Sequence, residues 1–167
     1  MTLRTARLRL RPVDAGDAAF IFELLNEPGW LRFIGDRGIR TLDDALGYVQ
    51  RLHAARQTHG FALDAVTLAD DDTPIGICGL IKRDTLDDVD IGFAFLQRFA
   101  STGFASEAAA AVLAQGHGEF GLRRIVAITS PDNAASQRVL QKIGMRFKKQ
   151  LRLDDDDAAS CLFASGI

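Results

Sequence analysis

Residues 90–107 constrain the fold most, because they join an apolar strand to a helix through a turn of small residues. The run 91–96 predicts a buried strand. The turn 97–103 follows it, and an Ala-rich helical pattern begins after the turn. Such a turn points successive main-chain N–H groups the same way, and the first N–H groups of a helix lack internal partners. The stretch therefore predicts a main-chain site for a phosphate group.

The turn does not match the common nucleotide-binding loops. It lacks the Gly-Lys-Ser/Thr of a P-loop and the GxGxxG of the dinucleotide-binding fingerprint. It resembles the acetyl-CoA loop of the GNAT superfamily of N-acetyltransferases, whose signature is Gln/Arg-x-x-Gly-x-Gly/Ala. The corresponding residues here are Arg98, Ser101 and Gly103, with Ser101 where the family usually has Gly. Serine is small enough to expose its N–H, although it tolerates a positive φ less well than glycine.

A second segment is similar to the branch of this superfamily that resembles ribosomal-protein N-acetyltransferases. That branch carries Asn-x-x-Ser, five further positions and then Lys-x-Gly-Phe. The matching residues are Asn133, Ser136, Lys142 and Gly144, and Met145 replaces the usual aromatic. The start at residues 7–12 and the Glu-Ala pair at 107–108 also resemble this branch, so the resemblance covers almost the whole chain.

The resemblance implies that acetyl-CoA binds between two splayed strands, which end at Leu96 and Thr129. Main-chain groups of Phe95 and Leu96 would pair with the pantetheine amides as an added strand does. N–H groups of the turn would hold the pyrophosphate, and Arg98 would add charge unless it is a solvated surface residue. The full set of expected cofactor residues is Phe95, Leu96, Arg98, Ser101, Thr102, Gly103, Phe104, Ala105, Asn133 and Ser136. Asn133 has a second reading as a helix cap.

The implied reaction is direct attack of an amine on acetyl-CoA in a ternary complex. Many GNAT members have a Tyr seven positions after the Asn, but that position is Leu140 here. Ser136 is the expected hydroxyl for the leaving sulfur, with a backbone-bonded first-turn Ser as the alternative. Asp90 is a candidate general base, and proton loss to solvent is equally open. The acceptor is a protein N-terminal amine or a small amine. Its specificity is expected from residues 27–60 and from the last hairpin, 148–160.

The periodicities predict a strand, three helical pieces, three antiparallel strands, and then helix, strand, helix and two strands. Helices are expected near 18–25, 42–59 and 105–120, and another begins at 130–132. Strands are expected at 3–12, 61–68, 74–81, 89–96, 124–129, 145–153 and 159–165. The fold class is therefore α+β, a GNAT-like mixed and mostly antiparallel sheet with splayed central strands and flanking helices. We expect a single domain over 1–167.

Composition narrows the remaining functions. The net charge of −2 gives no bulk attraction for nucleic acid, and no apolar run reaches the ~18 residues that span a bilayer. The N-terminal stretch lacks the apolar region of a signal peptide, and the histidines and cysteines lack metal-ligand spacing. We expect a cytoplasmic monomer or homodimer without a metal, with Cys78 and Cys161 reduced and buried. An exposed last strand would offer a surface for pairing between subunits.

Two other functions stay open at this stage. The Ser101 substitution, the absent Tyr and the lack of a strong base fit a catalytically silent module that holds CoA for sensing or assembly. An interaction protein without a cofactor is the third possibility, and it predicts no stabilisation by acetyl-CoA.

Overall fold

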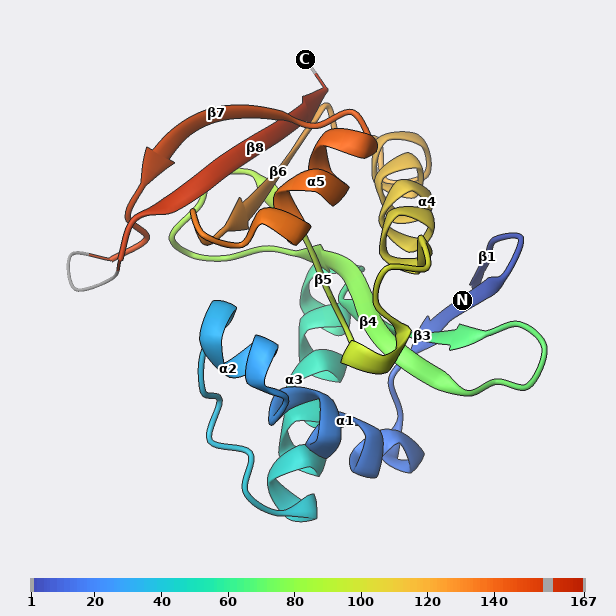
Figure 1. Ribbon diagram of the computed structural model, residues 1–167. Coiled ribbons are helices and arrows are strands. Elements are labelled where there is room, and N and C mark those ends of the chain that lie inside the picture. The colour runs from blue at the N-terminus through green and yellow to red at the C-terminus, as the bar shows by residue number, and fades with distance from the viewer. Residues whose placement is uncertain (1, 155–157, 167) are drawn as a thin grey trace.

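The structure is a computed structural model that describes residues 2–154 and 158–166. Eight strands form one sheet in the order β1-β2-β3-β4-β5-β6-β8-β7 (Figure 1). The strands are β1 (Leu3–Arg4), β2 (Leu8–Pro12), β3 (Leu63–Leu68), β4 (Pro74–Ile81), β5 (Val89–Phe95), β6 (Arg124–Thr129), β7 (Arg146–Leu151) and β8 (Ser160–Gly166). The helices are α1 (Ala18–Leu25), α2 (Pro28–Phe33), α3 (Leu42–His59), α4 (Phe104–Gly118) and α5 (Ala134–Lys142), with 3₁₀ turns η1 (Ala15–Asp17) and η2 (Gln97–Phe99).

The two longest helices, α3 and α4, differ in how their first turns are capped. Thr41 and Asp44 form a reciprocal capping box at the start of α3, and Gly60 ends the helix in the left-handed conformation at φ +84°. Gly103 is the N-cap of α4 and makes no side-chain cap bond. The start of α4 is consequently left open for another partner.

The central pair of strands is the one parallel pair among the described strands, and it separates along its length. β5 and β6 are in register only at Val89 with Ile125 and at Asp90 with Val126. β5 continues beside β4 as far as Phe95, and β6 continues beside β8 as far as Thr129. The carboxyl halves of β5 and β6 therefore diverge, as the sequence resemblance predicts.

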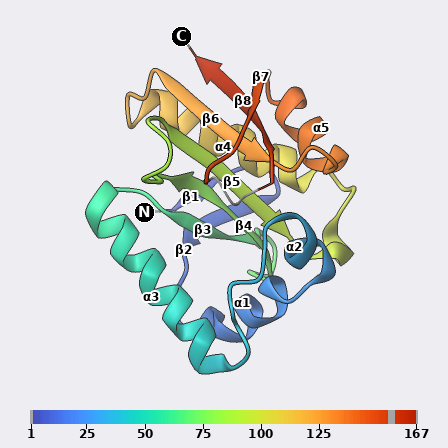
Figure 2. The ribbon, with the colours of Figure 1, turned by 90° about the vertical axis from the view of Figure 1, so that its left-hand side faces the viewer.

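Helices cover both faces of the sheet (Figures 1 and 2). One apolar cluster packs α4 and Leu140 of α5 against residues such as Val66 and Cys78. The other packs α1, α2 and α3 against residues such as Ala65 and Ile77. Adjacent strand residues thus point to opposite faces, which is the period-two pattern of a sheet buried on both sides.

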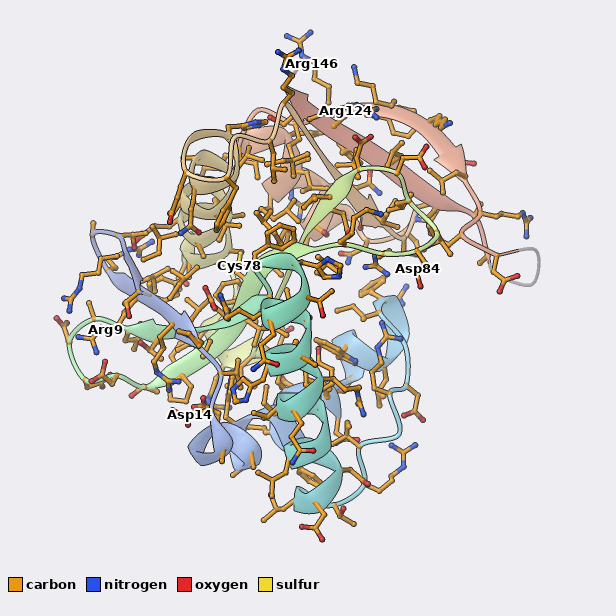
Figure 3. The ribbon with its side chains drawn as sticks, turned by 180° about the vertical axis from the view of Figure 1, so that it is seen from behind. Arg9, Asp14, Cys78, Asp84, Arg124 and Arg146 are labelled. Carbon is orange, nitrogen blue, oxygen red and sulfur yellow. The ribbon has the colours of Figure 1, made fainter. Side chains whose placement is uncertain are left out.

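Several boundaries differ from the prediction. The expected strand 3–12 is a hairpin of two strands, because Thr5 N–H bonds the Leu8 carbonyl and turns the chain. α5 begins at Ala134, because Asn133 is its cap and residues 131–132 form a turn before it. The last strand, β8, is not an edge: it lies between β6 and β7, and β7 is the exposed edge. Figure 3 shows Arg146, the first residue of β7, at the rim of the sheet.

Both cysteines are buried free thiols, as expected. Burial raises the pKa of the Cys78 thiol, so this thiol stays protonated at neutral pH. The acidic turn expected at 154–157 lies mostly outside the described residues.

Candidate functional site

The turn between β5 and α4 presents a row of main-chain N–H groups. Ser101 and Gly103 both adopt the left-handed conformation, at φ +63° and +82°. Alternation of right- and left-handed residues turns consecutive N–H groups to one side and forms an anion-binding nest. Ser101 therefore has a backbone conformation that favours glycine, at the position where the family signature has Gly.

These N–H groups are not used by the protein itself. The first internal bond of α4 runs from Glu107 N–H to the Gly103 carbonyl. Within the described part of the chain, the N–H groups of residues 101–106 have no acceptor. Upstream, Gln97 N–H is capped by the Glu27 carboxylate at 2.8 Å, and Phe99 and Ala100 bond within η2. The free donors are thus confined to the turn and the first turn of α4.

Glu107 fixes the position of the turn. Its carboxylate accepts from Thr5 Oγ1 at 2.5 Å, from Arg7 N–H at 2.9 Å and from Arg7 Nε at 2.7 Å. Arg7 also donates to the Thr102 carbonyl at 3.1 Å and lies over the Phe104 ring. Burial raises the pKa of Glu107, but these hydrogen bonds outweigh burial and leave the pKa lowered. The β1–β2 hairpin therefore holds the start of α4 in place.

The diverging strands leave main-chain groups of β5 without a strand partner. Leu96 N–H donates to the Ile75 carbonyl at 2.9 Å. In an antiparallel pair the hydrogen-bonded residues alternate, so the main-chain groups of every second residue before Leu96 on β5 also bond β4. Phe93 and Phe95 are the intervening residues, and their N–H and C=O groups face the gap toward β6. Leu96 differs from the expectation, because its N–H is bound to Ile75 and its carbonyl accepts from Phe99 N–H.

A cavity of about 730 Å³ lies over the turn and extends between α2, β5 and α5. It brings together seven of the expected cofactor residues: Phe95, Ser101, Gly103, Phe104, Ala105, Asn133 and Ser136. Leu96, Arg98 and Thr102 do not line it. The two sequence motifs, about thirty residues apart in the chain, thus meet at one cavity.

The charged residues of this cavity differ from those expected. Arg98 pairs with Glu23 at 2.6 Å and its side chain is 57% exposed, so it is a surface ion pair. Arg138 and Lys142 line the cavity instead, and neither has an ion pair or hydrogen bond with the described residues. They share one face of α5 with Ala135 and Val139. This i, i+3, i+4, i+7 spacing is the sequence pattern from which Arg138 and Lys142 could have been predicted to face the cavity.

Asn133 and Ser136 share the start of α5. Asn133 Oδ1 accepts from Ser136 N–H at 3.2 Å, so the cap reading of Asn133 holds. Its amide nitrogen makes no hydrogen bond with the described residues, and Asn133 lines the large cavity with Ser136. The Ser136 hydroxyl also makes none in that part of the chain. The alternative of a backbone-bonded Ser136 hydroxyl is therefore not what the structure has.

A second cavity of about 320 Å³ lies on the other side of the gap. The two cavities share a wall from α2, β5 and α5: Trp30, Phe33, Ile34, Phe93, Ala94 and Ser136. Segment 27–60, from which acceptor specificity is expected, contributes much of the smaller cavity's lining, from Trp30 to His59. None of the described residues between 148 and 160 lines it.

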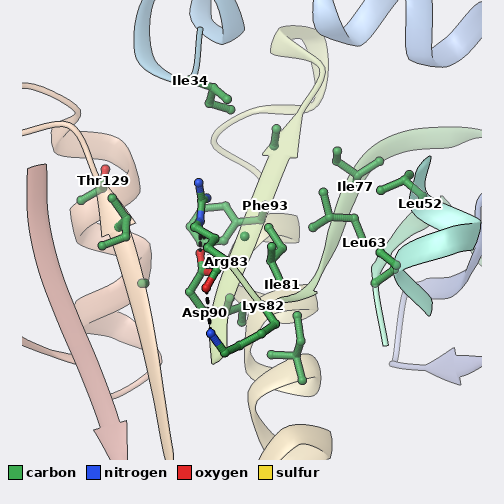
Figure 4. Close-up of a pocket in the computed structure, with 18 of the residues that line it drawn as sticks. Ile34, Leu52, Leu63, Ile77, Ile81, Lys82, Arg83, Asp90, Phe93 and Thr129 are labelled. Atoms are coloured by element: carbon green, nitrogen blue, oxygen red, sulfur yellow. Dashed lines mark hydrogen bonds and ion pairs between the residues drawn. The ribbon is translucent and has the colours of Figure 1, made fainter. Parts of the chain in front are cut away.

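Asp90 lines the smaller cavity only, and its carboxylate is 1% exposed. Both of its oxygens lie 3.2 Å from Nε of Arg83 (Figure 4). Burial raises the pKa of Asp90, and Arg83 opposes that shift. Asp90 precedes Phe93 by three residues, about 10 Å of extended strand, so it lies away from the junction of the cavities.

Two buried polar groups on the cavity walls lack partners. Trp30 Nε1 and Thr129 Oγ1 have no hydrogen-bond partner among the described residues, although each residue is only 6% exposed. An unpaired buried polar group costs about 1–3 kcal/mol. Both residues line the smaller cavity, and Trp30 lines the larger one as well. No sequence motif pointed to either residue as part of a site.

In the part of the chain that the structure describes, no group of three or more His, Cys, Asp or Glu side chains could hold a metal ion. No helix there is long and apolar enough to cross a membrane.

Comparison with known proteins gives consistent matches. The sequence profile described as "Acetyltransferase (GNAT) domain" matches residues 7–146. The uncharacterised N-acetyltransferase YnaD of Bacillus subtilis is 33% identical over 153 residues, which cover 89% of this chain and 87% of YnaD.

Solved structures agree in fold. A GNAT-family acetyltransferase from Bacillus anthracis superposes with a TM-score of 0.84 at 26% identity, covering 99% of this chain and 98% of the other. RimL, a ribosomal-protein α-N-acetyltransferase solved with coenzyme A, gives a TM-score of 0.85 at 17% identity, with 100% and 98% coverage. At that identity the likeness to RimL concerns the fold alone.

Proposed function

The chain belongs to the GNAT family of acetyltransferases, and on that premise we propose that it transfers the acetyl group of acetyl-CoA to an amine. The acceptor is a small-molecule amine or a protein N-terminal amine. The observation that carries the proposal is the row of unpaired N–H groups at residues 101–106, at the positive end of α4 and beside a large cavity.

The cofactor site follows from these donors. The pyrophosphate binds the N–H groups of the turn, and Arg138 and Lys142 supply positive charge from α5. The pantetheine arm enters the gap beside β5, where the main chain of Phe93 and Phe95 pairs with its amides. Asn133 contributes its free amide nitrogen. Leu96 and Arg98 are left out of this site, because their groups are engaged within the protein.

The chemistry takes place where the two cavities meet. The amine nitrogen attacks the thioester carbonyl carbon, and a main-chain N–H near Phe95 stabilises the oxyanion. Ser136 donates a hydrogen bond or proton to the departing thiolate from its free hydroxyl. The sequence makes Asp90 the candidate general base, but its ion pair with Arg83 favours a role in positioning Arg83 instead. We propose that the amine proton leaves to solvent.

The test measures acetyl-CoA binding by calorimetry and thiol release across a panel of amines. Gly103→Asp puts a carboxylate at the phosphate site and is expected to weaken acetyl-CoA binding by at least ~100-fold. Gly121→Asp is the matched control, because Gly121 also has a positive φ, +64°, and lies after the far end of α4. Both variants then carry the backbone strain of Asp at a positive φ, and they differ in whether the new carboxylate lies at the proposed phosphate site.

Three outcomes are distinguished. Turnover with at least one amine, lost in Gly103→Asp and retained in Gly121→Asp, supports the proposal. Tight CoA binding without turnover on any amine would favour the silent module. Equal acetyl-CoA affinity in both variants would contradict the placement of the cofactor.

A further inference from the structure

The charge of the smaller cavity is unbalanced. Its charged lining residues are Arg37, Lys82, Arg83 and Asp90, so three cations face a single carboxylate among the described residues. Lys82 is committed to main-chain carbonyls, those of Arg83 and Leu86. The two arginines therefore decide which acceptor the cavity attracts.

Asp90 positions Arg83 but binds only one of its nitrogens. Asp90 binds only the Nε of Arg83, and the two terminal nitrogens have no partner in the described part of the chain. Figure 4 shows the guanidinium reaching from Asp90 into the space between Thr129 and Phe93. Because Phe93 lines both cavities, this cation lies on the side of Asp90 that faces their shared wall.

Arg37 and Tyr48 also line the smaller cavity. Arg37 is exposed and makes no ion pair or hydrogen bond with residues 2–154 or 158–166. Burial raises the pKa of Tyr48, and the positive charges of Arg37, Arg51 and Arg83 oppose that shift. Tyr48 lines the same cavity as Arg37 and Arg83, and its hydroxyl has no hydrogen-bond partner among the described residues.

Much of the remaining wall is apolar, beside the polar residues His59, Ser130 and Ser136. Phe33, Ile34, Leu52 and Ile81 line the cavity, and the unpaired Trp30 Nε1 and Thr129 Oγ1 add two polar groups. An acceptor that fills this space needs an apolar body as well as an anionic group.

Building on the proposed function, we propose that the acceptor is an amine that also carries a carboxylate, of the apolar α-amino acid class. The carboxylate binds Arg83, Arg37 and the Tyr48 hydroxyl, and the side chain packs on the apolar wall. The amine then reaches the thioester at the junction. A C–N bond forms, the C–S bond breaks, one amine proton goes to solvent and the thiolate takes one proton. The products are an N-acetyl amino acid and CoA.

A protein N-terminus is disfavoured by the same residues. Its first residue has an amide where a free amino acid has a carboxylate, so it cannot supply the charge that the arginines match. Asp90 becomes a positioning residue for Arg83 in this account, rather than a base.

The test compares leucine, leucinamide and 3-methylbutylamine, which share the apolar body and the amine but differ in the carboxylate. We expect kcat/KM for leucine to exceed that for leucinamide by about 10-fold or more, as the loss of a charge-assisted hydrogen bond predicts. In Arg37→Gln the leucine-to-leucinamide ratio should fall about 10-fold. In Arg4→Gln, which removes an exposed charge on β1 at the far edge of the sheet, the ratio should be unchanged.

The outcomes separate this inference from the proposed function. Equal rates with leucine and leucinamide, a preference for a leucyl peptide over leucine, or a ratio insensitive to Arg37→Gln would overturn the inference and leave the acetyltransferase intact. Acetyl-CoA binding without turnover on any of the three amines would also overturn it. Absence of acetyl-CoA binding would instead contradict the proposed function itself.

Discussion

Ser136 keeps a free hydroxyl at the start of α5. The Asn133 side chain caps the helix by accepting from Ser136 N–H, and the Ser136 hydroxyl makes no hydrogen bond with the described residues. Because Ser136 lines both cavities, that hydroxyl lies where the two cavities meet. The motif in the sequence predicts both residues, but only the fold places Asn133 at the larger cavity and Ser136 at both.

Ser136→Ala tests the assignment of this hydroxyl to the leaving sulfur. We expect kcat to fall about 100-fold, the lower end of general-acid effects, with acetyl-CoA affinity within about 3-fold of wild type. Ser136→Thr keeps the hydroxyl and should recover part of the rate. Steady-state kinetics on any accepted amine gives both values, and an unchanged kcat in the Ala variant would remove Ser136 from the chemistry.

Residue roles that depend on distant partners could not be predicted from the sequence. Arg98 matches the family motif, but it pairs with Glu23, seventy-five positions earlier in the chain. Leu96 has its N–H bound to Ile75 on a neighbouring strand. Arg138, by contrast, follows from the helical spacing of α5 once one lining residue of that helix is known.

At the scale of elements, the start of α4 depends on a contact with the β1–β2 hairpin. Glu107→Gln removes the charge that accepts from Thr5 and Arg7. It also removes a negative charge from the first turn of the helix. We expect the free energy of unfolding to drop by about 1–2 kcal/mol.

The control is Glu119→Gln, the same change at the other end of α4, where Glu119 accepts only an exposed bond from Gln115 among the bonds identified for it. It should change stability by less than about 0.5 kcal/mol. Urea denaturation measures both variants. Equal effects from the two substitutions would mean that the hairpin contact does not stabilise α4.

The contact between β3 and α3 should make stability depend on pH. Burial raises the pKa of Asp64 to about 6, although Arg56 pairs with it. The folded state therefore binds this proton more tightly than the unfolded state does. The stabilisation of the folded state by protonated Asp64 is fully present below about pH 4. It is lost as the pH rises through 6, and the loss is on the order of 2–3 kcal/mol.

Asp64→Asn cannot titrate, so it isolates this effect. Relative to the variant, the wild type should become less stable between pH 4 and pH 7, whatever constant offset the substitution brings. Urea denaturation at four pH values measures the difference. A difference that stays constant across that range would contradict the raised pKa.

Element boundaries could be predicted where local signals agree. The bounds expected for β4 and β6 are those observed, and the Thr41 and Gly60 ends of α3 match as well. The start of α5 was placed too early, because Pro131 suits a first helical turn but here lies in the turn before Asn133. Local propensity does not reveal which of two capping residues the tertiary structure uses.

At the scale of the molecule, the splayed strands were expected from the family resemblance, whereas the position of β8 was not expected. β8 enters between β6 and β7, so β7 becomes the exposed edge. Strand order depends on long-range pairing, which a local pattern of apolar residues does not encode. The gap between β5 and β6 remains the feature on which the proposed cofactor site depends.

The most direct test of the account is a crystal structure of the protein with CoA. We predict pyrophosphate oxygens within about 3 Å of N–H groups among residues 101–106, and the pantetheine arm between the diverging ends of β5 and β6. CoA bound on another face, or a turn whose N–H groups do not contact phosphate, would contradict it.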